Sequence, residues 1–209
     1  MARYTGPVCR LCRRQSEKLM LKGERCLTPK CALERKQNAA GAKRRGRPRK
    51  VSEYGIRLKE KQKAKEVYGI LERQIRIYFA KAERMPGLAG ENLLKLLETR
   101  LDNTVYRLGF AESRRQARQL VRHGHFTLNG HKTDIPSCLV KPGDAIEWKE
   151  NKKKLFPYQS AAQNVGTAHI PGWLNLDEKT LSAKVLSSPS MEEIGVTINE
   201  RLIVEYYSK

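Results

Sequence analysis

Four of the five cysteines lie within the first 31 residues, at a spacing that suits a metal site. Cys9, Cys12, Cys26 and Cys31 follow the pattern C-x2-C-x13-C-x4-C. The two short gaps match those between ligands of structural zinc sites, and four thiolates complete a tetrahedral shell. Four thiolates also suit an iron–sulfur (4Fe-4S) cluster, and thiols without any ligand role are a third reading. We expect a closed, structural metal site and therefore favour Zn²⁺.

A run of basic residues follows the last of these cysteines. Residues Asn38 to Lys50 contain Lys43, Arg44, Arg45, Arg47, Arg49 and Lys50, with little apolar content. A segment of this composition does not form a core of its own. It is either a solvated linker or an arm that becomes ordered on RNA, and its charge density favours the arm.

The charge of the whole chain points to a polyanionic partner. Lys and Arg number 42 against 22 Asp and Glu, which gives a net charge of +20. Residues 1–65 hold 21 basic and 5 acidic side chains, whereas residues 134–209 hold 9 and 10. Such an imbalance favours nucleic acid, gripped mainly by the N-terminal part. No apolar run approaches the length of a membrane span, so a membrane is not expected as a partner.

The elements that position these residues are mostly helices. Apolar spacing predicts a helix over residues 58–82, with lysines crowding its first half and a break at Met85-Pro86-Gly87. A second helix is expected from Leu93 to Leu108, where an apolar stripe ends at Gly109. A third is expected from Ser113, a plausible N-cap, to Arg122.

Arginines line one face of the third predicted helix. Arg114, Arg118 and Arg122 are spaced four residues apart, and no acidic residue lies between Ser113 and Arg122. Their planar guanidinium groups fit phosphates, while pairing within the helix is not available. A solvated helix face is the plain alternative.

Short strands follow. Asn129-Gly130 between strand-like segments predicts a type I′ hairpin, and residues 140–148 add a turn and another strand. Residues 93–148 thus form an α-α-β-β-β pattern. Residues 151–190 are less readable, except that Trp173 and Leu174 look like core. The apolar C-terminal tail is expected to pack back onto a domain.

Several segments together closely resemble the family of bacterial small-subunit ribosomal protein four, in its metal-binding four-cysteine branch. The resemblance covers almost the whole chain and rests on Glu53-Tyr54-Gly55, Leu58 to Lys63, Gly90 to Leu94, Arg100 to Asn103, Val105 to Phe110, Arg118 to Val121, Pro142-Gly143-Asp144 and Ile198 to Lys209. Residues 151–195 match least well.

The resemblance implies an α+β fold with two domains. A mostly helical, metal-binding domain spans residues 1–98 and is completed by residues 196–209. An inserted domain, residues 99–195, carries the small RNA-binding module at about residues 99–162. The family further implies binding of 16S rRNA at a helix junction of the 5′ domain, early small-subunit assembly, contact with small-subunit protein five, and a share in decoding accuracy and in the path of incoming mRNA. The expected location is the cytoplasm.

An RNA junction is recognised largely by shape and backbone, so cations must approach it from several directions. The candidate RNA contacts are Arg44, Arg45, Arg47, Arg49, Lys50, Tyr54, Lys59, Lys61, Lys63, Arg100, Arg107, Arg114, Arg115, Arg118 and Arg122. Tyr54 is the only member that would stack on a base.

Two other functions fit parts of the sequence. Arg100-Leu101-Asp102 occurs in RNA-modifying pseudouridine synthases, but here it lies inside a predicted helix, and 209 residues leave no room for their catalytic domain. We therefore expect no enzyme activity and no small-molecule substrate. A free-standing RNA-binding regulator of translation is the second alternative.

Overall fold

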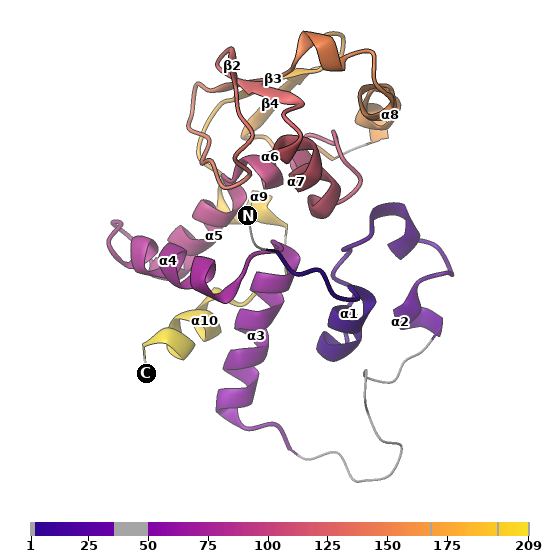
Figure 1. The fold of residues 1–209 in the computed structure, drawn as a ribbon. Coiled ribbons are helices and arrows are strands. Elements are labelled where there is room, and N and C mark those ends of the chain that lie inside the picture. Colours follow the sequence, from indigo (N-terminus) through magenta and orange to yellow (C-terminus); the bar gives the residue numbers. More distant parts are fainter. Residues whose placement is uncertain (1–2, 36–49, 168, 196, 209) are drawn as a thin grey trace. The chain divides into compact units, whose positions relative to one another are not determined.

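The computed structural model describes residues 3–35, 50–167, 169–195 and 197–208. The chain divides into two compact units (Figure 1). Unit 1 comprises Met1–Asn92 and Thr197–Lys209, and unit 2 comprises Leu93–Val196, a continuous segment inserted into unit 1. The division falls after Asn92, within a helix, whereas the sequence placed it after Glu98.

Within its described residues, every regular element of unit 1 is a helix. Its elements are α1 (Cys9–Gln15), the 3-10 helix η1 (Gly23–Cys26), α2 (Ala32–Arg35), α3 (Glu53–Val67), α4 (Glu72–Glu83), the first turn of α5 (Ala89–Glu98) and α10 (Glu200–Tyr207). The C-terminal tail folds back as α10 and packs along α3, which confirms that it joins a domain (Figure 1). Phe79 stacks on Tyr207 with ring centroids 4.5 Å apart.

The helix predicted over residues 58–82 is in fact two helices. Gly69 lies after the end of α3 with a φ of +62°, a left-handed conformation that stops a helix. The amide of Ile70 donates to Lys65 O and that of Gly69 to Glu66 O, which together form a Schellman motif. The apolar spacing continues across this turn, so periodicity alone merged α3 with α4.

Unit 2 places helices beside one antiparallel sheet. Its helices are the rest of α5, α6 (Leu101–Arg107), α7 (Arg114–Arg122), α8 (Phe156–Asn164) and α9 (Met191–Ile194), with 3-10 turns η2 (Glu150–Lys152) and η3 (Val165–Thr167). The strands are β1 (Phe126–Leu128), β2 (His131–Lys132), β3 (Ala145–Trp148), β4 (Leu174–Asp177) and β5 (Ser182–Val185), in the order β2-β1-β3-β5-β4. The predicted α-α-β-β-β pattern is confirmed in outline, and β4 and β5 extend the sheet with residues that the sequence left unassigned.

The second predicted helix is also split in two. Arg100 adopts an extended backbone and pairs with Leu139, between the end of α5 and the start of α6. The amide of Leu101 donates to Cys138 O and that of Val140 to Thr99 O. Pairing with a segment distant in sequence therefore interrupts a stripe that reads as continuous.

Local signals for turns and caps are confirmed. Ser113 caps α7 by accepting a hydrogen bond from the Gln116 amide. Gly109, with a φ of +75°, follows α6 as predicted. Asn129 and Gly130 both have positive φ, as a type I′ turn requires. The Asn129 side chain also accepts from the Ala145 amide at 2.8 Å and so joins the hairpin to β3.

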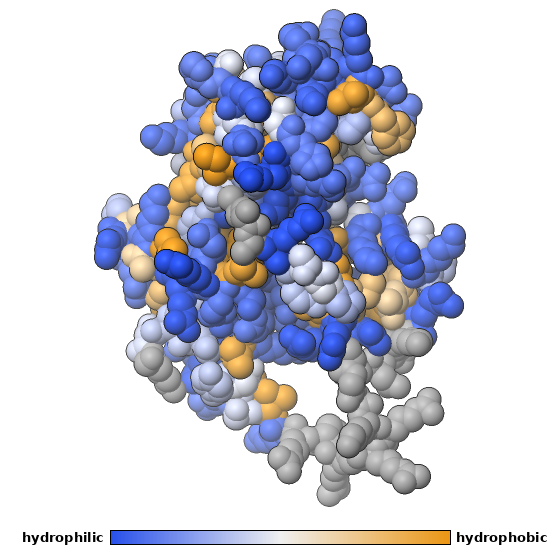
Figure 2. Space-filling model, viewed as in Figure 1, coloured by the Kyte–Doolittle hydropathy of each residue, from blue (hydrophilic) through white to orange (hydrophobic). Residues whose placement is uncertain are grey.

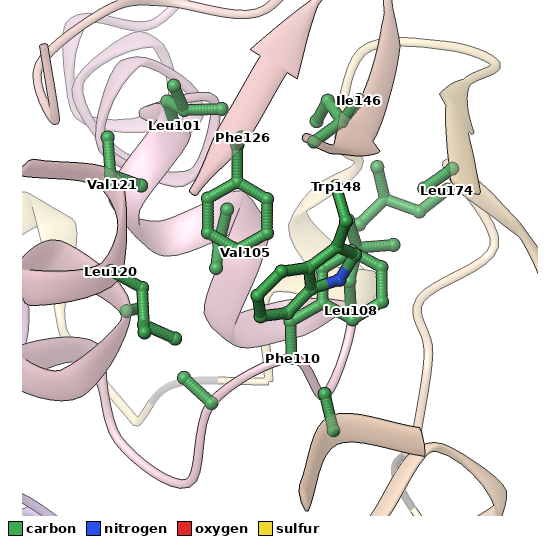
Figure 3. Close-up of a cluster of buried hydrophobic side chains, with 14 of the residues drawn as sticks. Leu101, Val105, Leu108, Phe110, Leu120, Val121, Phe126, Ile146, Trp148 and Leu174 are labelled. Carbon is green, nitrogen blue, oxygen red and sulfur yellow. The ribbon is translucent and has the colours of Figure 1, made fainter. Parts of the chain in front are cut away.

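The core of unit 2 lies between α6, α7 and the sheet (Figure 3). Phe126 and Trp148 pack with ring centroids 4.5 Å apart, and Phe110 contacts both rings. Trp173 and Leu174 are buried in the same cluster, as expected from the sequence. This core fixes the backbone from which the arginines of α7 project.

Candidate nucleic-acid interface

The arginines of α7 have acidic partners from other elements. Arg118 Nη1 lies 3.2 Å from Asp102 Oδ2 in α6, and Arg114 Nη2 lies 3.9 Å from Glu98 Oε1 in α5. Arg122 lies 4.0 Å from Asp134. No acid lies within this helix, as the sequence shows, but acids from positions far away in the sequence pair with these arginines. Arg122 keeps 56% of its side chain exposed, against 12% for Arg114 and 14% for Arg118.

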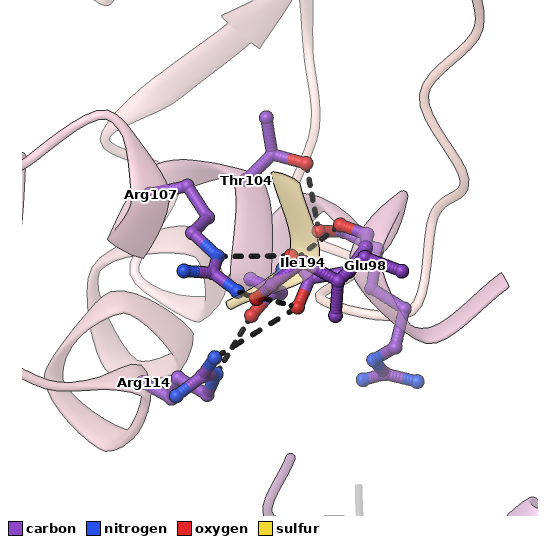
Figure 4. A network of polar contacts seen from close by, with 7 residues as sticks. Glu98, Thr104, Arg107, Arg114 and Ile194 are labelled. Atoms are coloured by element: carbon purple, nitrogen blue, oxygen red, sulfur yellow. Dashed lines mark hydrogen bonds and ion pairs between the residues drawn. The ribbon is translucent and has the colours of Figure 1, made fainter. Parts of the chain in front are cut away.

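Glu98 is the centre of an ion network in unit 2 (Figure 4). Its side chain is fully buried. It accepts hydrogen bonds from Arg107 Nε at 2.9 Å and Nη2 at 2.8 Å, and from Asn103 Nδ2 at 2.7 Å. Arg107 also donates to the Ile194 carbonyl, which ties α9 to the network. Arg107, a predicted RNA contact, therefore uses several of its N–H donors for hydrogen bonds inside the protein.

Asp102 is the centre of the second network. Arg100 Nε and Nη2 donate to its two oxygens at 3.0 and 2.7 Å, a bidentate arrangement. Only 1% of the Arg100 side chain is exposed. The prediction of Arg100 as an RNA contact is thus corrected: the guanidinium group is enclosed and neutralised by Asp102.

The lysines of α3 also separate into buried and exposed members. Lys61 Nζ lies 2.8 Å from Glu72 Oε1 and 4.6 Å from the centre of the Tyr206 ring, and Lys63 Nζ lies 2.7 Å from Glu17 Oε2. Both are buried, so neither presents its ammonium group on the surface as the sequence suggested. Lys59 is exposed, in agreement with its predicted role.

The remaining predicted contacts are distributed as follows. Lys50 is exposed, and Tyr54 is 59% exposed while one side of its ring faces Tyr206 at 5.7 Å. Arg115 is half-buried on α7. The arm residues Arg44, Arg45, Arg47 and Arg49 lie outside the described residues.

The four N-terminal cysteines are brought into one neighbourhood. All are free thiols, with Cys12 and Cys26 buried and Cys9 and Cys31 half-buried. Burial raises the pKa of the Cys12 thiol, and the charges of Cys26, Cys9 and Cys31 act in the same direction. The Lys22 amide donates to Cys26 Sγ at 3.3 Å. The four thiols are ligands of the type that a thiophilic metal prefers. Within residues 3–35 and the other described parts, however, no group of three or more Cys, His, Asp or Glu is arranged to hold an ion.

The comparisons with known proteins agree along the whole chain. The family described as "Ribosomal protein S4/S9 N-terminal domain" matches residues 3–98, and the "S4 domain" matches residues 99–146. Small ribosomal subunit protein uS4 of Heliobacterium modesticaldum is 56% identical over 209 residues, 100% of both chains. The proteins of that name from Pelotomaculum thermopropionicum and Geotalea daltonii are 54% and 55% identical, also over the full length of both chains.

This chain belongs to the uS4 family of small ribosomal subunit proteins. The resemblance seen in the sequence is thereby confirmed, as is the expectation of a ribosomal protein in place of an enzyme. No helix in the described part of the chain is both long and apolar enough to cross a bilayer.

The residues that hold Arg107, Arg114 and Arg118, two acids and one amide, were missed by sequence reasoning. Glu98, Asn103 and Asp102 sit on α5 and α6, and they face arginines nine to sixteen positions further along the chain. Arg114 Nε, for example, donates to Asn103 Oδ1 at 2.7 Å. No short motif encodes such pairs. One signal was available: Glu98 is close in sequence to Leu96, Leu97 and Leu101, all of which are buried.

Proposed function

We propose that this chain is a structural constituent of the small ribosomal subunit that binds rRNA through its phosphate backbone. The observation that carries this proposal is the full-length identity of 54–56% to proteins named for that subunit. The net charge of +20 supports it, because neutralising phosphates supplies much of the affinity for nucleic acid. Its place of action is then the ribosome in the cytoplasm.

The finer proposal is that the RNA is 16S rRNA, at a helix junction of the 5′ domain, where the protein nucleates assembly of the subunit body. Such a junction presents phosphates from several helices and is recognised by shape. Lys50, Lys59 and Arg122 are exposed cations on three separate stretches of the chain. The residues of the arm would add to them.

The two ion networks give the arginines a defined role in this binding. Buried carboxylates at Glu98 and Asp102 fix the guanidinium groups of Arg107, Arg114 and Arg118. A fixed guanidinium loses less conformational entropy when a phosphate approaches its remaining donors. Arg122, which is more exposed and held only at 4.0 Å, is the best probe of direct contact.

Contacts with small-subunit protein five and with mRNA as it enters, and a contribution to decoding accuracy, belong to the same proposal. They rest on the family resemblance of the sequence. Co-sedimentation with small subunits after a high-salt wash separates this function from that of a free-standing regulator, which would remain in the supernatant.

We propose further that Cys9, Cys12, Cys26 and Cys31 bind Zn²⁺, with a 4Fe-4S cluster as the alternative. Thiolate ligation would supply folding free energy to a segment with few buried apolar residues. Metal analysis of anaerobically purified protein, together with its visible absorbance, decides between them. A colourless protein with one zinc per chain supports zinc, a brown protein with iron supports the cluster, and protein without metal refutes both.

Binding to a transcript of the 16S 5′ domain tests the central proposal. About ten phosphate contacts would lower the affinity by several decades between low and moderate salt. Arg122→Ala should weaken binding and reduce the salt slope. Lys184→Ala, an exposed cation on β5 of the same unit, serves as the matched control and should change neither quantity. An affinity that is independent of salt, or equal losses in the two variants, would contradict the proposal.

A further inference from the structure

An exposed aromatic residue lies beside a group of lysines at the start of α8. Phe156 is 77% exposed and its neighbour Leu155 is 41% exposed. Lys149, Lys152, Lys153 and Lys154 precede them. Figure 2 shows an apolar area over α8 among hydrophilic side chains. We call residues 149–156 the lysine–phenylalanine surface.

The backbone beneath this surface is firmly held. The Lys149 amide donates to His125 O at 2.8 Å, the Lys152 amide to Lys149 O at 2.8 Å, and the Leu155 amide to Lys152 O at 3.1 Å. Trp148, on one side of the segment, and Tyr158, on the other, meet edge to face with centroids 5.5 Å apart. The Phe156 ring is therefore displayed from a fixed backbone.

The surface is also predominantly cationic. Lys153 pairs with Glu150, whose side chain is 86% exposed. Lys152 and Lys154 form no ion pair among the residues that the structure describes. Lys152 is close enough to His125 to contribute, after burial, to lowering the pKa of that imidazole. His125 follows the end of α7, so Lys152 lies on the side of the surface that is near that helix end.

An unpaired nucleotide matches this combination. Proteins bind single-stranded RNA by stacking bases on exposed aromatic rings within a groove of cations that follows the backbone. The centres of protein–protein interfaces, in contrast, are depleted of lysine. An exposed phenylalanine also lacks the free energy that burial would supply. A ring held in water by a rigid turn is therefore stronger evidence of a binding site than an apolar residue on a mobile loop.

We propose that the lysine–phenylalanine surface binds an unpaired nucleotide of the rRNA. The base would stack on Phe156, and the flanking phosphates would contact Lys152 and Lys154. This inference rests on the proposed function and adds a second contact, separate from the arginine face of α7. It assigns an RNA contact to the part of the chain whose sequence resembles the family least.

Affinity for the 16S 5′-domain transcript, measured with the full chain over a range of salt, tests the inference. Losing one base stack should weaken binding roughly tenfold, so Phe156→Ala lowers the affinity by that factor at every salt concentration without changing the salt slope. Lys152→Ala combined with Lys154→Ala should instead reduce the slope by about 1 to 1.5. Phe156→Trp should retain affinity, and its fluorescence should be quenched on binding.

Leu186→Ala is the matched control, because Leu186 is 54% exposed in the same unit. It should bind as the unchanged chain does. The inference is overturned if Phe156→Ala also binds normally, or if it loses affinity equally for a fully paired RNA hairpin. It is overturned as well if, in the absence of RNA, the unchanged chain binds another ribosomal protein and the Phe156→Ala variant does not. In each of these cases the proposed function is still supported if affinity falls steeply with salt and the Arg122→Ala variant binds more weakly. If the unchanged chain does not bind the transcript, the proposed function fails first.

Discussion

Substituting Glu98 by glutamine should destabilise unit 2 strongly. The change keeps the size of the side chain and one acceptor oxygen, but removes the negative charge that faces Arg107 and Arg114. It also places an amide N–H₂ near guanidinium donors. Breaking a buried ion pair by removing one partner costs about 3–5 kcal/mol, because the remaining charge stays desolvated.

The structure narrows that range for Glu98. The carboxylate is fully buried and accepts three short hydrogen bonds, but Arg107 and Arg114 keep 17% and 12% of their side chains exposed. Water can therefore reach part of each guanidinium when position 98 carries no charge, and we expect the lower end, about 3 kcal/mol. For a unit of this size, that corresponds to a decrease in Tm of more than about 10 °C.

Differential scanning calorimetry of the full chain measures this effect. Glu192→Gln is the matched control, since Glu192 is exposed on α9 of the same unit and pairs with no cation in the described structure. Its Tm should stay within about 2 °C of the unchanged chain. Combining Glu98→Gln with Arg107→Met should recover part of the loss, because one of the two arginine charges that face position 98 is then gone. A Glu98→Gln Tm equal to that of the control, or strictly additive losses in the double variant, would refute the account of the network.

Further predictions concern stability and its pH dependence. Gly69→Ala should lower the free energy of unfolding by about 1 kcal/mol, because alanine disfavours a φ of +62° even though its Cβ would meet no atom. A denaturant titration measures this, and Gly166→Ala, the control, should cost little. Equal effects of the two substitutions would contradict the prediction. Burial lowers the pKa of His125, with Lys152 and His123 acting in the same direction. In the unfolded chain, histidines have a pKa of about 6.5. The unfolded chain therefore binds more protons than the folded chain as pH falls, so the Tm of unit 2 should decline from about pH 7 to 5. His125→Phe should flatten that decline and His131→Phe, at an exposed position, should not; the reverse order would refute the assignment.

Much of the local structure was determined by the sequence itself. Ser113 caps α7, Gly109 ends α6, and Asn129-Gly130 makes the turn after β1, because these features depend on the φ preferences and hydrogen bonds of a few consecutive residues. The family could also be predicted from the sequence, because segments that resemble it are found along almost the whole chain. The charge imbalance and the cysteine spacing led to predictions of RNA and metal binding, and these stay predictions.

The tertiary structure alone decided which charges are available. Arg100, Lys61 and Lys63 read as surface cations, yet each is buried against a carboxylate. Lys61 and Lys63 meet Glu72 and Glu17 from other helices, and Arg100 is enclosed against the neighbouring Asp102 by the fold around it. Arg114 and Arg118 of α7 have no acid on their own helix, and their carboxylate partners lie on α5 and α6. The division of one apolar stripe into α5 and α6 likewise depends on pairing with Leu139. Strand pairing and most of these ion pairs join residues that lie far apart in sequence, so no local preference records them. The charge count predicts a polyanionic partner, but only the fold separates the exposed cations from those that hold the protein together.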